Sequence, residues 1–398
     1  MPGRTIRLTW QEPRLQAPAR YRRACGYDAY VPDPLRDLDL RLSAGVAGLA
    51  AEADAAVRAL NERARPALAP LARLLLRTES IASSKVEGMQ LDVRELARAE
   101  ARMETGGRVS RDALEILATI DAMELAVDEA ALPGRFAPAR ILAIHERLME
   151  RSQPARAAGR FRTVQNWIGG NDYNPCGADF VPPPPEHVTG LVDDLVAAID
   201  EESLPPLIQA ALVHAQFETI HPFDDGNGRT GRALIHVVLR RRRVAPAYVP
   251  PISVVLAARR ERYIAALTKY RQDSIEEWLE HFLSAALGSA RLASEYLAAV
   301  GELVGRWRDL VATSAGQLRA DATAWALIEQ LPAHPIVTAP VAAASTGRSK
   351  PQTYHAIRQL EDAGVLIPLS SGVRNRSWEA AGLLQLLAGL EAGESIRE

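Results

Sequence analysis

A polar, glycine-rich loop between two apolar stretches is the feature that most constrains how this chain folds. Residues 204–220 have the composition of a buried helix, and residues 233–243 form a second apolar stretch with helical spacing; the residues between them read HPFDDGNGRTGR. Gly226 and Gly228 carry no Cβ, so the backbone can turn sharply there and present N–H groups to an anion. The helix that follows directs its N-terminal dipole to the same place. The sequence therefore predicts an anion-binding loop between two central helices.

The charged side chains of this loop suit a polyphosphate. Arg229 and Arg232 are three residues apart on one face of the predicted helix, so both guanidinium groups can reach neighbouring phosphate oxygens. Asp225 supplies a hard oxygen ligand suited to Mg²⁺, and His221 can be neutral near pH 7 and accept a proton from an attacking hydroxyl. The alternative is a glycine-rich turn between two core helices with solvated arginines.

Helical periodicity predicts a mainly α fold for the rest of the chain. Residues 1–35 show little periodicity, and helical spacing begins at Leu38. Before the C-terminal region only residues 161–181 read as β, as a hairpin around a turn. After Pro332 the order helix, turn, helix, strand, turn, strand predicts a winged helix-turn-helix. We expect an N-terminal helical region (1–110), a helical core with the hairpin (111–285), connecting helices (286–330) and a small α/β winged-helix domain (331–398).

The charge balance and the cysteines narrow the class of protein. The 47 basic and 49 acidic residues give a net charge of −2, so no overall field drives the chain toward nucleic acid or a membrane. No run approaches the roughly 18 apolar residues of a membrane span. Cys25 and Cys176 lie far apart in contexts unlike a metal-ligand pair, which predicts neither a disulfide nor a zinc site and makes Cys176 an incidental exposed thiol. These features favour a cytoplasmic protein with no membrane partner.

Two other features of the core have plain structural interpretations. His214 lies seven residues before His221 without a third metal ligand, so we interpret it as a core or surface histidine. The arginine run at 240–243 ends a predicted helix, where it complements the helix dipole, and we interpret it as a solvated helix end.

The sequence HPFDDGNGRTGR resembles, at every defining position, the signature of the Fic family, His-x-Phe-x-[Asp/Glu]-Gly-Asn-Gly-Arg-x-x-Arg. The resemblance covers about residues 35–285, and the element order is similar to that of multidomain bacterial members. It implies a Fic helical core with a β-hairpin flap. It also implies transfer of AMP from ATP to a Tyr, Thr or Ser hydroxyl of a target protein, or of the enzyme itself. Members that phosphorylate their targets carry Lys at the position of Gly228, so nucleotidyl transfer is favoured.

The resemblance assigns a role to each residue of the signature. His221 would be the general base, and Phe223 would anchor the loop in the core. Asp225 would hold Mg²⁺, while Arg229 and Arg232 would contact the β- and γ-phosphates. The phosphate cradle would consist of Gly226, Asn227 and Gly228.

A second motif, Ser83-x-x-x-Glu87-Gly88, resembles the inhibitory motif of the family, [Ser/Thr]-x-x-x-Glu-[Gly/Asn]. Its place before the core is similar to that in members inhibited by a helix of the same chain. The resemblance implies that Glu87 pairs with Arg232 and occupies the space of the γ-phosphate, so that ATP binds unproductively. The alternative is a solvated glutamate near a helix end.

The predicted hairpin at 161–181 resembles the family's flap, which holds the target segment by strand addition. The flap residues expected to contact the target are Val164, Trp167 and Ile168. For Trp167 and Ile168 the alternative is packing within the hairpin.

The segment after the core is similar to the family's adenine pocket, with a departure. Ile252, Ser253 and Tyr263 fit the pattern, and Tyr263 is expected to contact the nucleotide. The expected Asn and second Tyr are Arg259 and Ile264 here, so recognition of the base departs from the family pattern.

The predicted winged helix leaves further functions open. Residues 345–376 hold five basic and two acidic residues, an excess of three positive charges. DNA binding is one interpretation, and protein interaction or dimerisation is the other. The whole chain could then be a DNA-binding regulator with a nucleotide-sensing Fic core, or an enzyme that removes AMP with a water oriented by Glu87. The residues that could contact DNA phosphates are Arg348, Lys350, Arg374 and Arg376.

Overall fold

The structure, a computed structural model, describes residues 3–11, 17–62, 69–104, 106–151, 158–314, 318–369 and 376–396. The fold is mainly α, as the sequence predicted, with two small antiparallel sheets in these ranges. The chain divides into two compact units. Met1–Asp54, Asp121–Val244 and Arg259–Ser284 form the first unit, and Ala55–Ile120, Ala245–Ala258 and Ala285–Glu398 form the second. The four consecutive domains expected from the sequence stay a prediction.

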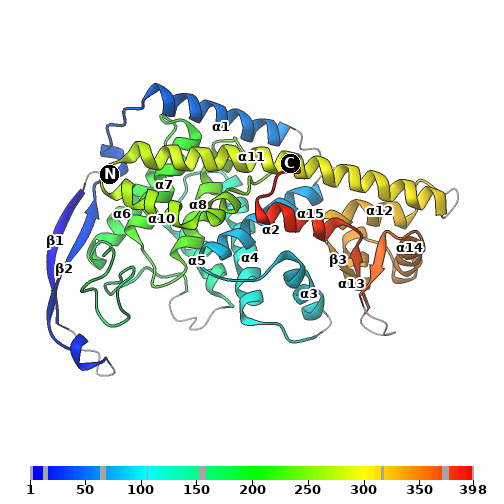
Figure 1. Ribbon diagram of the computed structural model, residues 1–398, viewed down its shortest axis with the longest axis horizontal. Helices are drawn as coiled ribbons and strands as arrows, with labels where there is room; N and C mark the ends of the chain where they lie inside the picture. Colours follow the sequence, from blue (N-terminus) through cyan, green and yellow to red (C-terminus); the bar gives the residue numbers. More distant parts are fainter. Residues whose placement is uncertain are drawn as a thin grey trace. The chain divides into compact units, whose positions relative to one another are not determined.

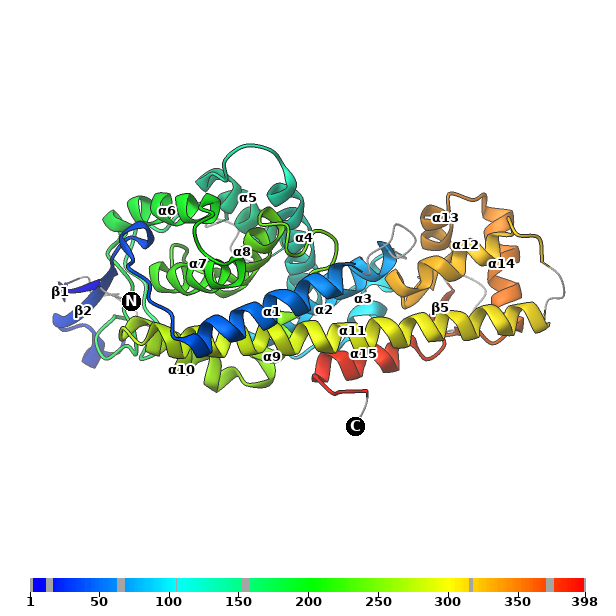
Figure 2. The same ribbon diagram turned by 90° about the horizontal axis from the view of Figure 1, so that it is seen from above.

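Helix α7 (Pro206–Ile220) is the centre of the first unit. All of its residues from Leu207 to Ile220 are buried, because the helix is apolar on almost every face and is surrounded by protein. Helix α8 (Asn227–Arg241) packs beside it (Figure 2), and α6 (Pro185–Asp200) and α10 (Arg260–Arg271) also contact α7. Helix α5 (Pro138–Met149) packs on α8. The prediction of two central helices on either side of the loop is confirmed.

Helices α7 and α8 approach closely at Gly231. A Cβ added there would lie 2.6 Å from Glu218 Oε1 and 2.9 Å from Phe217 Cδ1, distances that no real side chain tolerates without a shift. The absence of a side chain at Gly231 is therefore what allows this packing.

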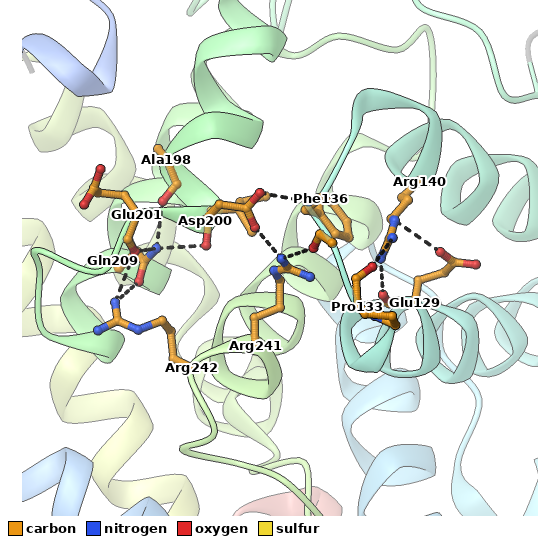
Figure 3. Close-up of polar contacts among 12 residues, drawn as sticks. Glu129, Pro133, Phe136, Arg140, Ala198, Asp200, Glu201, Gln209, Arg241 and Arg242 are labelled. Atoms are coloured by element: carbon orange, nitrogen blue, oxygen red, sulfur yellow. Dashed lines mark hydrogen bonds and ion pairs between the residues drawn. The ribbon is translucent and has the colours of Figure 1, made fainter.

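Two arginines at the end of α8 fasten it to α6 and the neighbouring loops (Figure 3). Arg241 Nη2 lies 2.5 Å from Asp200 Oδ1, and Asp200 Oδ2 accepts from the main-chain N–H of Phe136 at 2.9 Å. Arg242 donates to the side chain of Gln209, which itself donates to main-chain carbonyls at the end of α6. The interpretation of the arginine run as a solvated helix end is therefore wrong for these two residues, since both are half-buried and their guanidinium groups bind protein groups.

The N-terminal residues form a hairpin that the sequence analysis did not predict. Strand β1 (Gly3–Trp10) pairs antiparallel with β2 (Cys25–Pro32) (Figure 1). In this register Trp10 lies opposite Cys25. The period-two alternation of Ile6, Leu8 and Trp10 is half-buried, and arginine and threonine separate these residues. These polar residues made the alternation typical of a strand difficult to recognise in the sequence. The expectation that β structure occurs only at 161–181 before the C-terminal region is wrong.

The segment 161–181, predicted as a hairpin and called the flap from here on, contains one isolated bridge between Ile168 and Phe180. Ile168 N donates to Phe180 O at 2.8 Å, and Asp179 N donates to Ile168 O at 2.9 Å. The rest of the flap is shaped by side-chain contacts and not by a strand ladder.

The second unit is built around α2 (Ala69–Val86), which packs on α9 (Ile252–Ala258). The buried carboxylate of Glu79 accepts from Ser253 N at 2.7 Å and from Ser253 Oγ at 2.6 Å, which joins the two helices. Helix α3 (Val93–Glu104) belongs to the same unit. Three helices contribute residues to both units: α1 (Ala44–Glu62), α4 (Arg111–Ala131) and α11 (Ile275–Ser314). Helix α11 is one continuous helix of 40 residues where the sequence predicted several.

The C-terminal part of the second unit combines short helices, of which Figure 2 labels α12, α13 and α14, with a three-stranded sheet. The sheet has the order β3-β5-β4, with both pairs antiparallel. Ser349 and Gln352 form a capping box at the start of α14. The assignment as a winged helix stays a prediction. The elements are α12 (Thr323–Gln330), β3 (Ile336–Thr338), α13 (Ala339–Thr346), α14 (Lys350–Asp362), β4 (Leu366–Pro368), β5 (Ser377–Ala380) and α15 (Leu383–Ala392).

None of the helices in the described part of the chain combines the length and the apolar character needed to cross a bilayer.

Candidate active site

The loop between α7 and α8 reverses the chain through two residues in left-handed conformations. His221 ends α7 with φ 49° and ψ 60°, and Gly226 precedes α8 with φ 74° and ψ 7°. Glycine adopts this conformation readily, whereas a histidine must be held in it by its surroundings. The first-turn N–H groups of α8 point into the loop, as they do at any helix N-terminus.

Hydrogen bonds within the loop fix its path. The side chain of Asn227 accepts from Phe223 N at 2.9 Å and donates to Phe223 O at 2.8 Å. Phe223 is buried, and its ring stacks on His145 with 3.6 Å between centroids and 4° between planes. Asp225 Oδ1 accepts from Gly226 N at 2.6 Å. The expectation that Phe223 anchors the loop in the core is confirmed.

Two side chains that the sequence analysis missed hold the carbonyl group of His221. Arg162 Nε donates to His221 O at 2.9 Å, and Asn166 Nδ2 donates to the same oxygen at 3.1 Å and to Phe223 O at 2.9 Å. Arg162 is 3% exposed, and its guanidinium also donates to three other main-chain oxygens. Burial lowers the pKa of Arg162 to about 10, so it remains a cation at neutral pH. Both residues lie more than 50 positions from His221, so no local pattern could identify them.

His145 on α5 holds the other side of the loop. Its Nδ1 accepts from Gly159 N at 3.1 Å, which leaves Nε2 to donate to Asp225 O at 3.0 Å. Burial lowers the pKa of His145 to about 4, so the ring stays neutral at pH 7 and keeps this tautomer. A Cβ at Gly226 would lie 3.3 Å from His145 Nε2, so this contact also favours glycine at that position.

Both arginines of the signature are buried in α8. Arg229 is 4% exposed and Arg232 is 1% exposed, so the alternative of solvated arginines is wrong. Burial of a guanidinium is costly unless charged or polar groups compensate it, and the planar fork suits phosphate oxygens. Two such cations one turn apart can neutralise a polyphosphate at the N-terminal end of α8.

Tyr263, expected at the adenine pocket, lies in the core of the first unit. Its hydroxyl lies 2.8 Å from His214 Nε2, and both side chains are buried beside Trp278. Burial, helped by the charge of Arg232, lowers the pKa of His214 to about 3. The interpretation of His214 as a core histidine is confirmed. Ile252 and Ser253 lie in the second unit, so the contribution of these residues to one nucleotide pocket stays a prediction.

The three flap residues differ in what they contact. Val164 is 56% exposed, Trp167 packs edge-on against Trp10 of β1 at 5.7 Å, and Ile168 forms the bridge to Phe180. Packing within the chain therefore occurs for Trp167 and Ile168, and their contact with a target stays a prediction.

The structure contains a disulfide between Cys25 and Cys176. The prediction that no disulfide forms, and that Cys176 is a free thiol, is wrong. The cysteines are 151 residues apart in sequence, and they meet because β2 begins beside the tip of the flap. Nothing in their local sequences indicates this contact.

The inhibitory motif lies at the end of α2 in the second unit. Ser83 is buried, and Glu87 and Gly88 are exposed in the turn after the helix, where Gly88 has φ 92°. Glu87 N donates to Ser84 O at 3.1 Å. Arg232 belongs to the first unit, and its pairing with Glu87 stays a prediction.

The basic residues near α14 differ in exposure and in the protein groups that they contact. Arg348 and Lys350 are exposed at the start of the helix. Arg376 instead contacts Glu361 at 3.1 Å, and its guanidinium lies 4.8 Å from the centre of the Trp378 ring. Arg374 lies outside the described residues. DNA contact by these residues stays a prediction.

Asp225 suits a magnesium ion that is also bound by phosphates. Its carboxylate is exposed at the loop, and Mg²⁺ is commonly held by one or two carboxylates together with substrate phosphates and water. Within the described ranges no group of three or more His, Cys, Asp or Glu side chains is arranged to hold a metal without such a substrate. The donor set therefore fits Mg²⁺ bound together with a nucleotide.

Two family models match the chain. The Fic/DOC family matches residues 135–239, and the N-terminal model of the Fic/DOC family matches residues 48–128. The chain is 34% identical over 113 residues to protein adenylyltransferase fic-1 of Caenorhabditis elegans, which covers 28% of this chain and 20% of that protein. It is 35% identical over 126 residues to protein adenylyltransferase Fic of Nematostella vectensis, covering 31% and 26%. The matched region is thus less than a third of the length of these curated relatives.

Solved structures show the same fold. A Fic family protein from Desulfovibrio desulfuricans G20 aligns with 86% of this chain and 98% of its own, with a TM-score of 0.52 and 21% identity. Residues 134–508 of Fic-1 from C. elegans align with 64% of this chain and 74% of that chain, with a TM-score of 0.50 and 21% identity.

Proposed function

The chain belongs to the Fic/DOC family, and from this we propose that it is a protein adenylyltransferase, which transfers AMP from ATP to a Tyr, Thr or Ser hydroxyl. The single observation that carries the proposal is the loop at the start of α8. There His221, Asp225 and two buried arginines lie within twelve residues, on a backbone fixed by Asn227. The names of the curated relatives support the same activity.

His221 is proposed to act as the general base. Its carbonyl group is held by two side chains, so the backbone that carries the imidazole is fixed before a target arrives. The imidazole takes the proton of the target hydroxyl while the hydroxyl oxygen attacks the α-phosphorus. The new O–P bond forms as the bond to the pyrophosphate oxygen breaks, and pyrophosphate leaves.

The start of α8 is proposed to hold the triphosphate. The N–H groups of Gly226, Asn227 and Gly228 would face the phosphates, and Arg229 and Arg232 would contact the β- and γ-phosphates. These groups are in place before the reaction, so little reorganisation is needed when charge shifts to the leaving group. Asp225 would hold Mg²⁺, which when bound neutralises phosphate charge.

Regulation by Glu87 is part of this proposal. The carboxylate would pair with Arg232 and exclude the γ-phosphate, so removal of Glu87 should activate transfer. Removal of AMP by the same site, with a water oriented by Glu87, is the alternative reaction. The cytoplasm supplies ATP and is the compartment that we propose.

Mass spectrometry of modified proteins tests the activity. Purified Glu87→Gly protein is incubated with labelled ATP, Mg²⁺ and a cell lysate, and an increment of one AMP on a hydroxyl side chain is the expected product, on lysate proteins or on the enzyme itself. His221→Ala should lose transfer by about 10² to 10⁴-fold and still bind ATP. Asp225→Ala and EDTA should each stop transfer. Retained transfer in His221→Ala would exclude the assigned base.

The His221→Ala variant also distinguishes the enzyme from the alternative function, a DNA-binding regulator. A regulator would keep DNA binding in His221→Ala, with an affinity that falls steeply with salt. Because Arg376 already contacts Glu361, Arg348→Ala with Lys350→Ala is the sharper test of DNA binding. The other interpretation of the winged helix, dimerisation, predicts a homodimer, which the elution volume of the protein in size-exclusion chromatography tests.

A further inference from the structure

The N-terminal hairpin covers one edge of the flap. Tyr30 N in β2 donates to Val181 O at 2.9 Å, while Phe180 uses its own N–H and carbonyl for Ile168. Successive carbonyl groups of an extended chain point to opposite sides. The extended segment 180–181, one limb of the flap, therefore has β2 along one edge and Ile168, on the other limb, along the opposite edge. The hairpin therefore occupies one edge, and the limb that carries Val164 and Ile168 lies on the other.

Aromatic packing strengthens this contact along its length. Trp10 of β1 lies against Trp167, and the ring of Tyr21 stacks on Tyr173 at 5.3 Å with 24° between planes. Asn174 Nδ2 donates to Tyr21 O at 3.1 Å. These contacts join the two segments at the base, the middle and the tip of the flap.

The disulfide is the one covalent tie between the two segments. Both Cys25 and Cys176 are partly exposed, and we expect a thiol reagent to reach the bond. The flap itself has a single isolated bridge, and pairing of that extent has little stability of its own. Arg162 and Asn166 bind the start of the flap to the His221 loop, so it is the order of the rest of the flap that depends on the hairpin, and the disulfide holds the hairpin in place.

We propose that Cys25 and Cys176 form a reversible thiol–disulfide modification site that controls the order of the flap, with a dithiol as the reducing partner. A thiolate of the dithiol attacks one cysteine sulfur, which releases the other cysteine as a thiolate and leaves a mixed disulfide; the second thiol of the dithiol then closes onto its own first sulfur and displaces the attacked cysteine. The chain gains two electrons and two protons as two thiols, and the dithiol becomes a disulfide. Disulfides of proteins in reducing compartments are mostly of this transient kind.

The consequence for catalysis rests on the proposed function. An ordered flap presents the limb 164–168 to a target segment without the cost of ordering it first, so oxidation should favour binding of the protein target. Reduction should weaken target binding and leave ATP binding unchanged, because the phosphate site lies on α8.

Hydrogen exchange of the full chain tests the proposal without any target. Exchange is measured by mass spectrometry before and after dithiothreitol for the Tyr30 amide, which is hydrogen-bonded between hairpin and flap, and for the Ile168 and Asp179 amides, which are hydrogen-bonded within the flap. We expect a gain of two hydrogens in mass and at least about tenfold faster exchange of these amides after reduction. The exchange rates of amides in α7 should be the same before and after reduction. Removal of the reductant and reoxidation should restore the slow exchange.

Serine variants separate the disulfide from general effects of the reductant. Cys25→Ser and Cys176→Ser should each exchange as fast as the reduced protein and should not respond to dithiothreitol. Two titratable thiols in protein purified without reductant, or equal exchange with and without the bond, would overturn the proposal. If exchange changes as expected but neither form transfers AMP, the proposed function fails and the modification site stands.

Discussion

Acid is expected to destabilise the first unit, because the imidazole of His214 is buried and neutral. Its pKa is lowered to about 3 by burial first and then by the charge of Arg232, whereas the unfolded chain titrates near 6.5. Between these values the unfolded state binds more protons, so the free energy of unfolding falls as the pH falls. From pH 7 to pH 5, one such histidine lowers that free energy by about 2 kcal/mol.

His145 adds to this effect. Burial lowers its pKa to about 4, so it also stays neutral in the folded state down to about pH 5. Its contribution over the same interval is again about 2 kcal/mol. Together the two histidines remove about 4 kcal/mol, a large share of the roughly 5–15 kcal/mol that stabilises a typical domain.

Urea unfolding at pH 7, 6 and 5, followed by tryptophan fluorescence, measures the effect. His214→Gln removes the titrating group and keeps a donor near the hydroxyl of Tyr263, which lies 2.8 Å from the imidazole. The loss of stability between pH 7 and pH 5 should shrink by about 2 kcal/mol in this variant. His355→Gln, at an exposed position on α14, is the matched control and should keep the wild-type loss. If His214→Gln loses as much stability as the wild type, the buried neutral histidine is not the cause.

Three further predictions follow from the loop and its surroundings. Gly231→Ala should destabilise the protein by about 1–3 kcal/mol in urea unfolding, because its Cβ would meet Cδ1 of the buried Phe217 ring at 2.9 Å; an unchanged midpoint would contradict the close packing. Asn227→Ala removes two hydrogen bonds within the loop and should lower the rate of AMP transfer more than tenfold, whereas Asn227→Asp, which keeps one acceptor, should lose less. Glu87→Gly should raise self-modification by up to about two orders of magnitude, and adding Arg232→Ala should abolish the gain; no increase would exclude the inhibitory role.

The central helices and their loop were predictable because their signal is local. A largely apolar stretch, Gly226 and Gly228, and an arginine pair within 29 residues, 204–232, indicate a buried helix, a turn and a helix start. Burial of Phe223, Arg229 and Arg232 agrees with that interpretation. The spacing of apolar residues and the composition are properties of a single helix or turn, so they can be recognised in the sequence without knowledge of the fold.

The supports of the loop were not predictable, because they act across the fold. Main-chain oxygens of the loop accept hydrogen bonds from Arg162, Asn166 and His145. Every residue has a main-chain oxygen, so the loop sequence does not indicate which side chains bind it. The disulfide is a contact of the same kind, over 151 residues. The N-terminal hairpin is different, since the alternation of Ile6, Leu8 and Trp10 was present and was obscured by the surrounding arginines and threonines.

The way the loop is held also limits how it can be transplanted. A designer who grafted residues 221–232 onto another pair of helices would carry over the reactive groups without the conformation, because nothing in the graft keeps His221 at a positive φ. The hydrogen bonds that hold the loop come from α5 and from the segment that starts at Arg162. The smallest segment that would keep the loop conformation after transfer therefore runs from Pro138 to Arg241. Nearly the same span, residues 135–239, is what the family model matches. The proposed chemistry therefore depends on a scaffold of four helices, α5 to α8, of which the twelve-residue signature is only one part.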